Sequence, residues 1–214
     1  MSTIVIFGGT GYAGGNIARE AAKRGHTVIS YSRHEPTTPD AGVEYRLGSL
    51  ADDAVIAQAA TVADEVVVAV HGADVDGATL ASRLPALIAA AIANDARLSF
   101  VGGAGSALVA PGGPRLVDTP DFREEWKPEA LSHAEVLDAL RASPAELRWF
   151  YVSPAALFGA FAAGETTGAY RTDGDVLVTK EDGSSEISGT DFALAYVDEI
   201  EQSNHPRQRF TTGH

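Results

Sequence analysis

The chain has 214 residues, of which 45% are hydrophobic and 21% are charged, as expected for a globular protein of one or two domains. Its formal net charge of −13 argues against nucleic acid or an anionic membrane as a partner, since both require clustered lysine and arginine. The absence of cysteine excludes disulfides, thiolate metal sites and a cysteine nucleophile, and the six histidines lack the spacing of metal ligands.

The first residues contain no basic segment, and the apolar run at 4–7 is far shorter than the roughly 18 residues of a membrane span. No other stretch of the sequence approaches that length. We therefore expect a cytoplasmic protein with no membrane partner, present as a monomer or a homodimer.

Apolar β-branched runs alternate with helical patterns through the first 150 residues. Predicted strands cover 4–7, 26–31, 43–46, 65–70, 97–101 and 147–152. Predicted helices cover 12–24, 78–94 and 128–141, and a further helix, capped by Asp52 or Asp53, runs to about Thr61. Gly25 is placed to end the first helix, whereas Pro85 is expected to bend the third or to mark a later start. This order predicts an α/β fold, a doubly wound parallel sheet with helices on both faces.

The remaining segments have less periodicity. The stretch 102–128 is rich in glycine and proline, and it is predicted to be a long functional loop with a short helical piece near 121–126. Residues 153–189 are irregular, apart from a predicted hairpin over 170–179. A last helix over 191–200, capped by Thr190, and a strand over 209–211 are expected to close the chain.

A glycine-rich segment follows the first predicted strand and opens the first predicted helix. Gly8 permits a tight turn, Gly11 lets an anion approach the backbone, and Gly14 lets the helix pack closely. The free N–H groups of the helix N-terminus would then bind a pyrophosphate. This context favours a dinucleotide-binding loop over a tight turn of another α/β fold, and adds three expected contacts: Thr10, Tyr12 and Ala13.

The end of the second strand predicts which dinucleotide is preferred. No acid stands there, and Ser32 and Arg33 offer a hydroxyl and a guanidinium that suit a 2′-phosphate. We therefore expect NADP(H) to be preferred over NAD(H). Two alternatives remain: Glu35 could bind the ribose, and Arg33 could be a solvated loop cation.

Residues 4–33 (IVIFGGTGYAGGNIAREAAKRGHTVISYSR) resemble the compact NAD(P)H-binding group of atypical short-chain dehydrogenases/reductases, which includes NADH-flavin reductases and biliverdin reductase B. The segments at 102–106, 116–122, 151–158 and 187–201 are similar to the same group. The resemblance implies a Rossmann-type sheet of seven or eight strands. It also implies a single NAD(P)-binding domain over 1–214, with a cofactor-binding core at about 1–152, a small irregular substrate-side insertion at about 153–189, and a closing helix and strand at 190–214.

The same resemblance implies further cofactor contacts. Residues 48–50 would border the adenine, although the group often has aspartate where Ser49 stands. Residues 70–72 would line the ribose, and Pro154 would lie near the nicotinamide. The expected contacts outside the glycine loop and the second strand are therefore Ser49, Leu50, Val70, His71, Gly72, Gly102 and Pro154.

The usual catalytic pair of this superfamily is missing. Standard members carry Tyr-x-x-x-Lys and a serine, but the helix after the fifth strand has His133 instead, with Leu137 four residues later. His133 could transfer a proton, Ser106 stands where the serine usually falls, and Lys127 could reach a phosphate or an anionic substrate. Each also has an ordinary interpretation, as an exposed helix residue, a turn residue and a surface cation respectively.

A flat acceptor that is itself chemically reactive fits this incomplete set of catalytic residues. Orientation over the nicotinamide does most of the chemistry when the acceptor is a flavin or a quinone. Phe122, Trp126 and Phe158 could stack on such an acceptor or simply pack in the core. We therefore expect an NAD(P)H-dependent oxidoreductase that passes a hydride from NADPH to this small-molecule acceptor. The alternatives are a redox sensor that binds NADP(H) without turnover and, third, an epimerase- or dehydratase-like enzyme.

Overall fold

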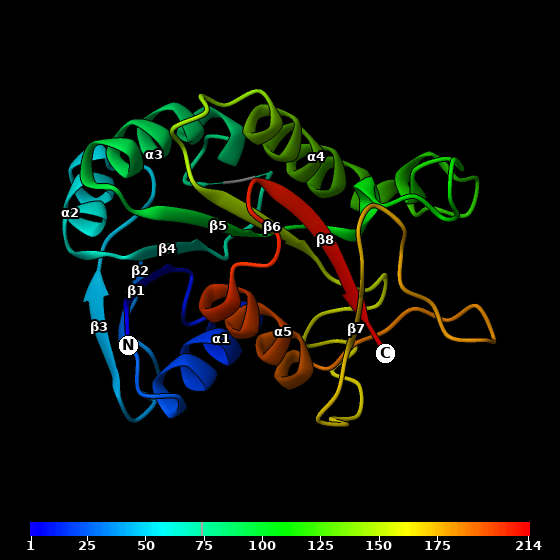
Figure 1. The fold of residues 1–214 in the computed structure, drawn as a ribbon, viewed down its shortest axis with the longest axis horizontal. Coiled ribbons are helices and arrows are strands. Elements are labelled where there is room, and N and C mark those ends of the chain that lie inside the picture. Colours follow the sequence, from blue (N-terminus) through cyan, green and yellow to red (C-terminus); the bar gives the residue numbers. More distant parts are fainter. Residues whose placement is uncertain (74) are drawn as a thin grey trace.

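The computed structural model describes residues 1–73 and 75–214, and one eight-stranded sheet runs through it with helices on both faces (Figure 1). The strands are β1 (Thr3–Phe7), β2 (Thr27–Ser32), β3 (Val43–Leu47), β4 (Glu65–Val68), β5 (Arg97–Val101), β6 (Trp149–Ser153), β7 (Arg171–Asp173) and β8 (Gln208–Gly213). The α-helices are α1 (Tyr12–Lys23), α2 (Asp53–Val62), α3 (Leu80–Asn94), α4 (Lys127–Arg141) and α5 (Gly189–Gln202). Short 3₁₀ helices are η1 (Ala104–Ser106), η2 (Leu116–Asp118) and η3 (Glu124–Trp126), of which only η3 was predicted.

The strand order is β3-β2-β1-β4-β5-β6-β8-β7. Neighbouring strands are parallel except for β7, which pairs antiparallel to β8 at one edge. The order reverses between β1 and β4, and such a switch point opens a crevice at the carboxyl ends of the strands. The predicted Rossmann-type fold is confirmed, with an antiparallel edge strand added to the parallel sheet.

Two apolar layers hold the helices against the sheet. In β1, Ile4 and Ile6 pack toward α1 and α5, whereas Val5 and Phe7 pack toward α2, α3 and α4. Figure 1 shows the same division, with α1 and α5 below the sheet and the other three helices above it. The strand is buried on both faces, which explains its unbroken β-branched and aromatic run.

Two helices contain a proline whose predicted role the structure can test. Helix α3 begins at Leu80, where the Thr79 side chain accepts a hydrogen bond from the Ser82 N–H, and it continues through Pro85. Pro85 therefore does not mark the start of the helix. The helix tolerates the loss of the one backbone hydrogen bond that proline, which has no N–H group, cannot make. Helix α4 begins at Lys127, one residue before Pro128, which stays in its first turn.

The hairpin predicted over residues 170–179 is wrong. Strand β7 pairs with β8, placing Arg171 opposite Gly213, and the chain then turns toward the loop that follows β5. There the Leu177 N–H donates to the Leu108 carbonyl at 2.8 Å. The chain does bend after β7, but β7 pairs with the open edge of β8, which is distant in sequence, instead of with the residues that follow the bend.

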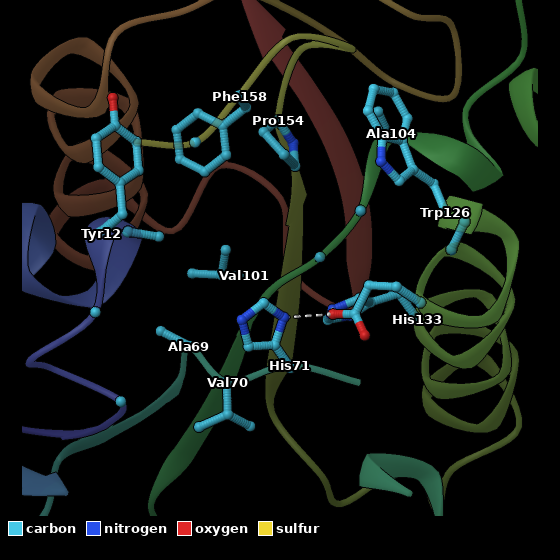
Figure 2. Close-up of a pocket in the computed structure, with 18 of the residues that line it drawn as sticks. Tyr12, Ala69, Val70, His71, Val101, Ala104, Trp126, His133, Pro154 and Phe158 are labelled. Carbon is cyan, nitrogen blue, oxygen red and sulfur yellow. Dashed lines mark hydrogen bonds and ion pairs between the residues drawn. The ribbon is translucent and has the colours of Figure 1, made fainter. Parts of the chain in front are cut away.

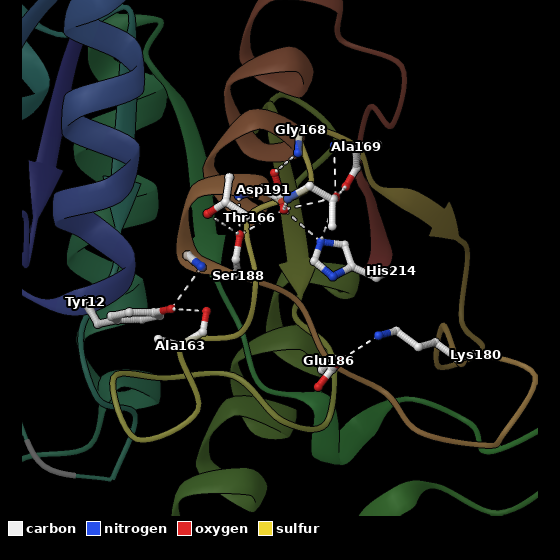
Figure 3. A network of polar contacts seen from close by, with 12 residues as sticks. Tyr12, Ala163, Thr166, Gly168, Ala169, Lys180, Glu186, Ser188, Asp191 and His214 are labelled. Atoms are coloured by element: carbon white, nitrogen blue, oxygen red, sulfur yellow. Dashed lines mark hydrogen bonds and ion pairs between the residues drawn. The ribbon is translucent and has the colours of Figure 1, made fainter.

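The cap of α5 is Ser188 rather than Thr190. The Ser188 hydroxyl accepts a hydrogen bond from the Asp191 N–H at 3.0 Å and donates to the Asp191 carboxylate at 2.9 Å. The same carboxylate accepts hydrogen bonds from the Thr167 and Gly168 N–H groups, and it lies 2.8 Å from Nε2 of His214 (Figure 3). Asp191 therefore fastens the loop before β7 and the C-terminal residue to the start of α5.

We expect Gly14→Ala to lower the free energy of unfolding by roughly 1–3 kcal/mol, since an added Cβ would overpack a closed contact. That Cβ would lie 2.3 Å from the Gly8 carbonyl oxygen. The measurement is urea-induced unfolding followed by circular dichroism. Gly174→Ala is the control, because a Cβ there meets nothing within 4 Å. Equal midpoints for the two variants would contradict this account of the glycine loop.

Candidate functional site

A cavity of about 970 Å³ lies at the carboxyl ends of β1, β2, β4, β5 and β6. Its walls include Gly8 after β1, Ser32 at the end of β2, Val70 after β4 and Pro154 after β6. This is the crevice that the reversal of strand order creates.

Most of the predicted cofactor contacts line this cavity. They are Gly8, Thr10, Gly11, Tyr12, Ala13, Ser32, Arg33, Ser49, Leu50, Val70, His71, Gly102 and Pro154. Gly14 and Gly72 lie behind the wall. Gly14 presses on the Gly8 peptide, and the Gly72 N–H donates to Glu129 at 2.9 Å. Segments far apart in sequence therefore converge on one space, as the predicted topology requires.

The glycine loop has the shape of an anion cradle. Gly8 adopts a φ of +89°, a conformation that side chains disfavour, and the Gly11 N–H donates back to its carbonyl at 3.0 Å. A Cβ on Gly11 would meet only the Gly8 carbonyl oxygen, at 3.3 Å, so the cavity side of Gly11 is open. The first N–H groups of α1 have no partner within the helix and can serve an anion there.

Tyr12 connects this loop to the C-terminal part of the chain. Its hydroxyl accepts a hydrogen bond from the Gly189 N–H at 2.9 Å and donates to the Ala163 carbonyl at 3.3 Å (Figure 3). Its ring packs edge-on against Phe158, with 5.4 Å between the ring centroids. Tyr12 therefore positions the irregular segment after β6 over the cavity, and its hydroxyl is occupied by backbone groups.

An ion pair lies at the end of the cavity beside β2. Nη1 of Arg33 is 2.8 Å from Oδ1 of Asp76, and the Ser49 hydroxyl donates to the other carboxylate oxygen. The hydrogen bond from Ser49, reinforced by Arg33, lowers the pKa of the Asp76 carboxyl below its ordinary value. Arg33 remains largely exposed, and Asp76 is its ion-pair partner.

A carboxylate that the sequence did not single out organises the opposite wall. Glu129, in the first turn of α4, accepts hydrogen bonds from the N–H groups of Gly72 and Ala73, both at 2.9 Å. Nδ1 of His71 and Nε2 of His133 lie 3.2 and 3.1 Å from the same carboxylate. Figure 2 shows the imidazole of His71 projecting into the cavity.

The network determines the protonation of its members. Partial burial alone would raise the pKa of Glu129, but hydrogen bonds from His133, His71 and two backbone amides outweigh it and hold that pKa well below its usual range. Because the ionised carboxylate only accepts, both imidazoles donate to it. The hydrogen bond to Glu129 in turn raises the pKa of His71, whose side chain is 89% exposed.

The three predicted catalytic residues have different environments. His133 lines the cavity, but its Nε2 is committed to Glu129. Ser106 is outside the lining, and its hydroxyl is buried with no partner among the described residues. Lys127 is also outside the lining and pairs with Glu124. The structure thus brings only His133 to the cavity.

Tyr151 does not replace the missing catalytic tyrosine. It lies in β6, and its hydroxyl donates to the His133 carbonyl at 3.0 Å and accepts from the Gly103 N–H at 3.3 Å. Burial raises the pKa of this hydroxyl far above its ordinary value. Gly102 is required here, because a Cβ on it would lie 2.0 Å from the Tyr151 ring.

Aromatic side chains line the end of the cavity beside η3. The Trp126 ring lies between Phe122 and Phe161, with centroid distances of 6.4 and 6.3 Å. Trp126 and Phe161 are 39% and 74% exposed, so they are not core residues. Phe158 is on the other side of the cavity, facing Tyr12 (Figure 2). These rings offer flat apolar surfaces to a ligand.

Two other kinds of feature do not occur among the described residues. No cluster of three or more histidine, aspartate or glutamate side chains is arranged to hold a metal ion. None of the helices in residues 1–73 and 75–214 combines the length and hydropathy needed to cross a bilayer.

Sequence reasoning missed Glu129, Asp76 and Gly9. Glu129 and His133 are four residues apart on one helix, a spacing that pairs side chains and was a usable signal. Gly9 stands where a Cβ would lie 2.4 Å from the Ser30 hydroxyl, a contact that only the packing of β2 reveals. Asp76 belongs to a loop whose approach to Arg33 has no local signature.

Known proteins resemble this chain along its whole length. A family model described as NAD(P)H-binding matches residues 8–203. The chain is 35% identical over 212 residues to YwnB, an uncharacterised protein of Bacillus subtilis, covering 97% of this chain and 96% of that protein. Two solved structures, each covered over 100% of both chains, are a "putative exported protein" of Burkholderia pseudomallei (39% identity, TM-score 0.87) and a "putative NADH-flavin reductase" of Streptococcus pneumoniae (33% identity, TM-score 0.82).

We expect Glu129→Gln to lower the pKa of His71 toward the ordinary value of about 6.5, because a neutral amide stabilises the imidazolium less. The folded-state pKa of His71 is raised, so the stability that this pair contributes is full at low pH. That contribution is lost as the pH rises through the pKa of folded His71. NMR titration of the His71 ring measures the shift. Glu135→Gln, exposed on the same helix, should leave this pKa unchanged, and an unchanged value in Glu129→Gln would refute the network.

Proposed function

The chain belongs to the NAD(P)H-binding family, and we propose that it is an NADPH-dependent reductase that transfers a hydride to a flat acceptor such as a flavin or a quinone. The supporting observation is one continuous cavity that extends from Arg33, past the glycine loop, to Trp126 and Phe161. Its volume of about 970 Å³ is at the upper end of small-molecule sites, which are roughly 300–1,000 Å³. A dinucleotide would fill the cavity from Arg33 to the glycine loop and beyond it to Pro154. The aromatic end at Trp126 and Phe161 would remain free for a second ring system.

The glycine loop would hold the pyrophosphate. Its open face at Gly11 and the N-terminus of α1 suit two linked phosphates without requiring a lysine or arginine. Arg33, at the β2 end, would favour the 2′-phosphate, and this supports NADPH as the preferred form. The Ser32 hydroxyl donates to the His34 carbonyl at 2.6 Å, so it would have to exchange that hydrogen bond to bind the phosphate. Ser49 and Leu50 would border the adenine, and Pro154 would lie near the nicotinamide.

Bound NADPH would supply a hydride from its nicotinamide ring, and two-electron reduction of the acceptor then requires one proton as well. We assign that proton to His71, which projects into the cavity and whose raised pKa keeps its ring protonated to higher pH. Glu129 would hold the imidazolium in place, and His133 would act by orienting Glu129. Ser106 and Lys127, which do not line the cavity, receive no role in this scheme.

The aromatic end of the cavity supports the class of acceptor. Trp126 and Phe161 come from η3 and from the segment after β6, and their rings pack against each other with 6.3 Å between the centroids. Together they present one apolar aromatic surface on which a flat ring could stack. A similar protein of Streptococcus pneumoniae carries the name "putative NADH-flavin reductase", which names the same class of acceptor with the other nicotinamide cofactor. Irregular residues 153–189 would then form the substrate side of a single cofactor-binding domain. We propose that the activity is cytosolic, since a chain without cysteine needs no oxidising compartment to form disulfides.

Two other functions remain as outcomes of the test. A redox sensor would bind NADP(H) without turnover. An epimerase or dehydratase would need a tyrosine as acid or base, and the described tyrosines that line the cavity are Tyr12 and Tyr31. The Tyr12 hydroxyl is held by backbone groups, and the Tyr31 hydroxyl accepts from Arg46 at 3.4 Å. This makes the third function the weakest.

We expect Gly11→Val to weaken NADPH binding by at least tenfold while the protein stays folded. The backbone of Gly11 has a φ of −81°, which valine accepts, but the side chain would fill the phosphate cradle. The measurement is a fluorescence titration with NADPH, with circular dichroism as the folding check. Gly174→Ala should bind as the wild type does. Undiminished binding to a folded Gly11→Val protein would place the dinucleotide elsewhere.

We expect the wild-type protein to oxidise NADPH when FMN or a quinone is added. The measurement is the loss of NADPH absorbance at about 340 nm.

We expect Trp126→Ala to raise the KM for the acceptor several-fold, because stacking surface is lost, with little effect on NADPH affinity. Leu131→Ala, an exposed apolar residue on α4 outside the cavity, is the matched control. Tight NADPH binding without any oxidation would support the sensor instead.

A further inference from the structure

Asp76 occupies an unusual position at the β2 end of the cavity. Its carboxylate bridges Arg33 and Ser49, the residues that face the adenosine end of the proposed cofactor. One oxygen lies 2.8 Å from Nη1 of Arg33, and the other accepts the Ser49 hydroxyl. The carboxylate thus makes the contacts that a phosphate monoester would make with the same two donors.

We propose that Asp76 sets the dinucleotide preference of the protein by competing with the 2′-phosphate of NADPH for Arg33 and Ser49. The proposal rests on the proposed function, and it concerns the choice between two cofactors rather than the reaction. Asp76 would be a specificity-determining residue. Arg33 would attract the 2′-phosphate of NADPH, and Asp76 would limit the affinity that this attraction provides.

The competition follows from charge. A 2′-phosphate carries a charge of about −1.5 to −2, so it cannot share Arg33 with a carboxylate without repulsion. Binding NADPH requires Asp76 to release both donors, whereas NADH has only a hydroxyl at this position. That hydroxyl can donate to the Asp76 carboxylate, as it does to the acid of an NAD-selective site. Asp76 therefore opposes one cofactor and assists the other.

The surroundings make this exchange feasible. The side chains of Arg33 and Asp76 are 63% and 33% exposed, and exposed ion pairs hold weakly. A phosphate can therefore displace the carboxylate without disrupting the core. Asp76 also adopts a φ of +53°, a left-handed conformation that asparagine tolerates as well as aspartate does. Asp76→Asn consequently removes the charge while it preserves the backbone of this loop.

The test is a titration of the wild type, Asp76→Asn and Arg33→Ala/Asp76→Asn with NADPH and with NADH, by intrinsic fluorescence or calorimetry. Asp118→Asn is the control. It removes the same charge from another Asp–Arg pair, and neither Asp118 nor Arg115 lines the cavity. We expect Asp76→Asn to bind NADPH five- to tenfold more tightly and NADH no more tightly, and the double variant to lose this gain. Asp118→Asn should bind both as the wild type does.

Each other result overturns the proposal in a recognisable way. Equal changes for NADPH and NADH in Asp76→Asn, or no change for either, would reject Asp76 as a determinant while leaving the proposed reductase intact. A gain that persists without Arg33 would show that the competition is not for this guanidinium. A wild-type protein that binds neither dinucleotide would refute the proposed function together with this inference.

Discussion

The close approach of α1 to the turn after β1 is the constraint on which the site depends. At Gly14 the helix lies against the Gly8 peptide, and Gly8 itself turns with a φ of +89° beneath the loop after β4. A side chain at Gly8 or Gly14 would push the helix away from the ends of β1 and β4. The cradle, the direction of the helix N-terminus and the crevice at the strand switch would then be lost together. Close packing here therefore determines where the proposed pyrophosphate site lies.

Glu129 imposes a second constraint, this time between helix and loop. Its carboxylate joins the first turn of α4 to the backbone after β4, and it holds His71 and His133 by the same oxygen. A partly buried carboxylate is stable only when donors surround it, and here two amides and two imidazoles do so. The arrangement therefore defines one wall of the cavity and keeps a protonatable ring at its surface.

The fold was predictable because its signals are local. The strand β1, the glycine loop and the end of α1 at Gly25 each follow from a few adjacent residues. The predictions that failed involve partners distant in sequence. Strand β7 pairs with the edge of β8, and the Ser188 cap of α5 is linked through Asp191 to the loop before β7. The candidate site divides in the same way. The glycine spacing predicted the loop whose backbone would contact the cofactor. Asp76 and Glu129 interact with residues in other loops, and no local sequence pattern connects them.

The acidity of the chain and its affinity for an anionic dinucleotide are compatible because different parts of the cavity provide the attraction. At the glycine loop the positive field comes from backbone N–H groups, which do not depend on the net charge of −13. At the β2 end it comes from one arginine that a neighbouring carboxylate already engages. In the proposed binding mode, the portion common to NADH and NADPH would therefore meet a fixed backbone, and the portion that distinguishes them would meet exposed side chains. A single substitution at the rim would then alter cofactor choice without disturbing the fold that binds the rest.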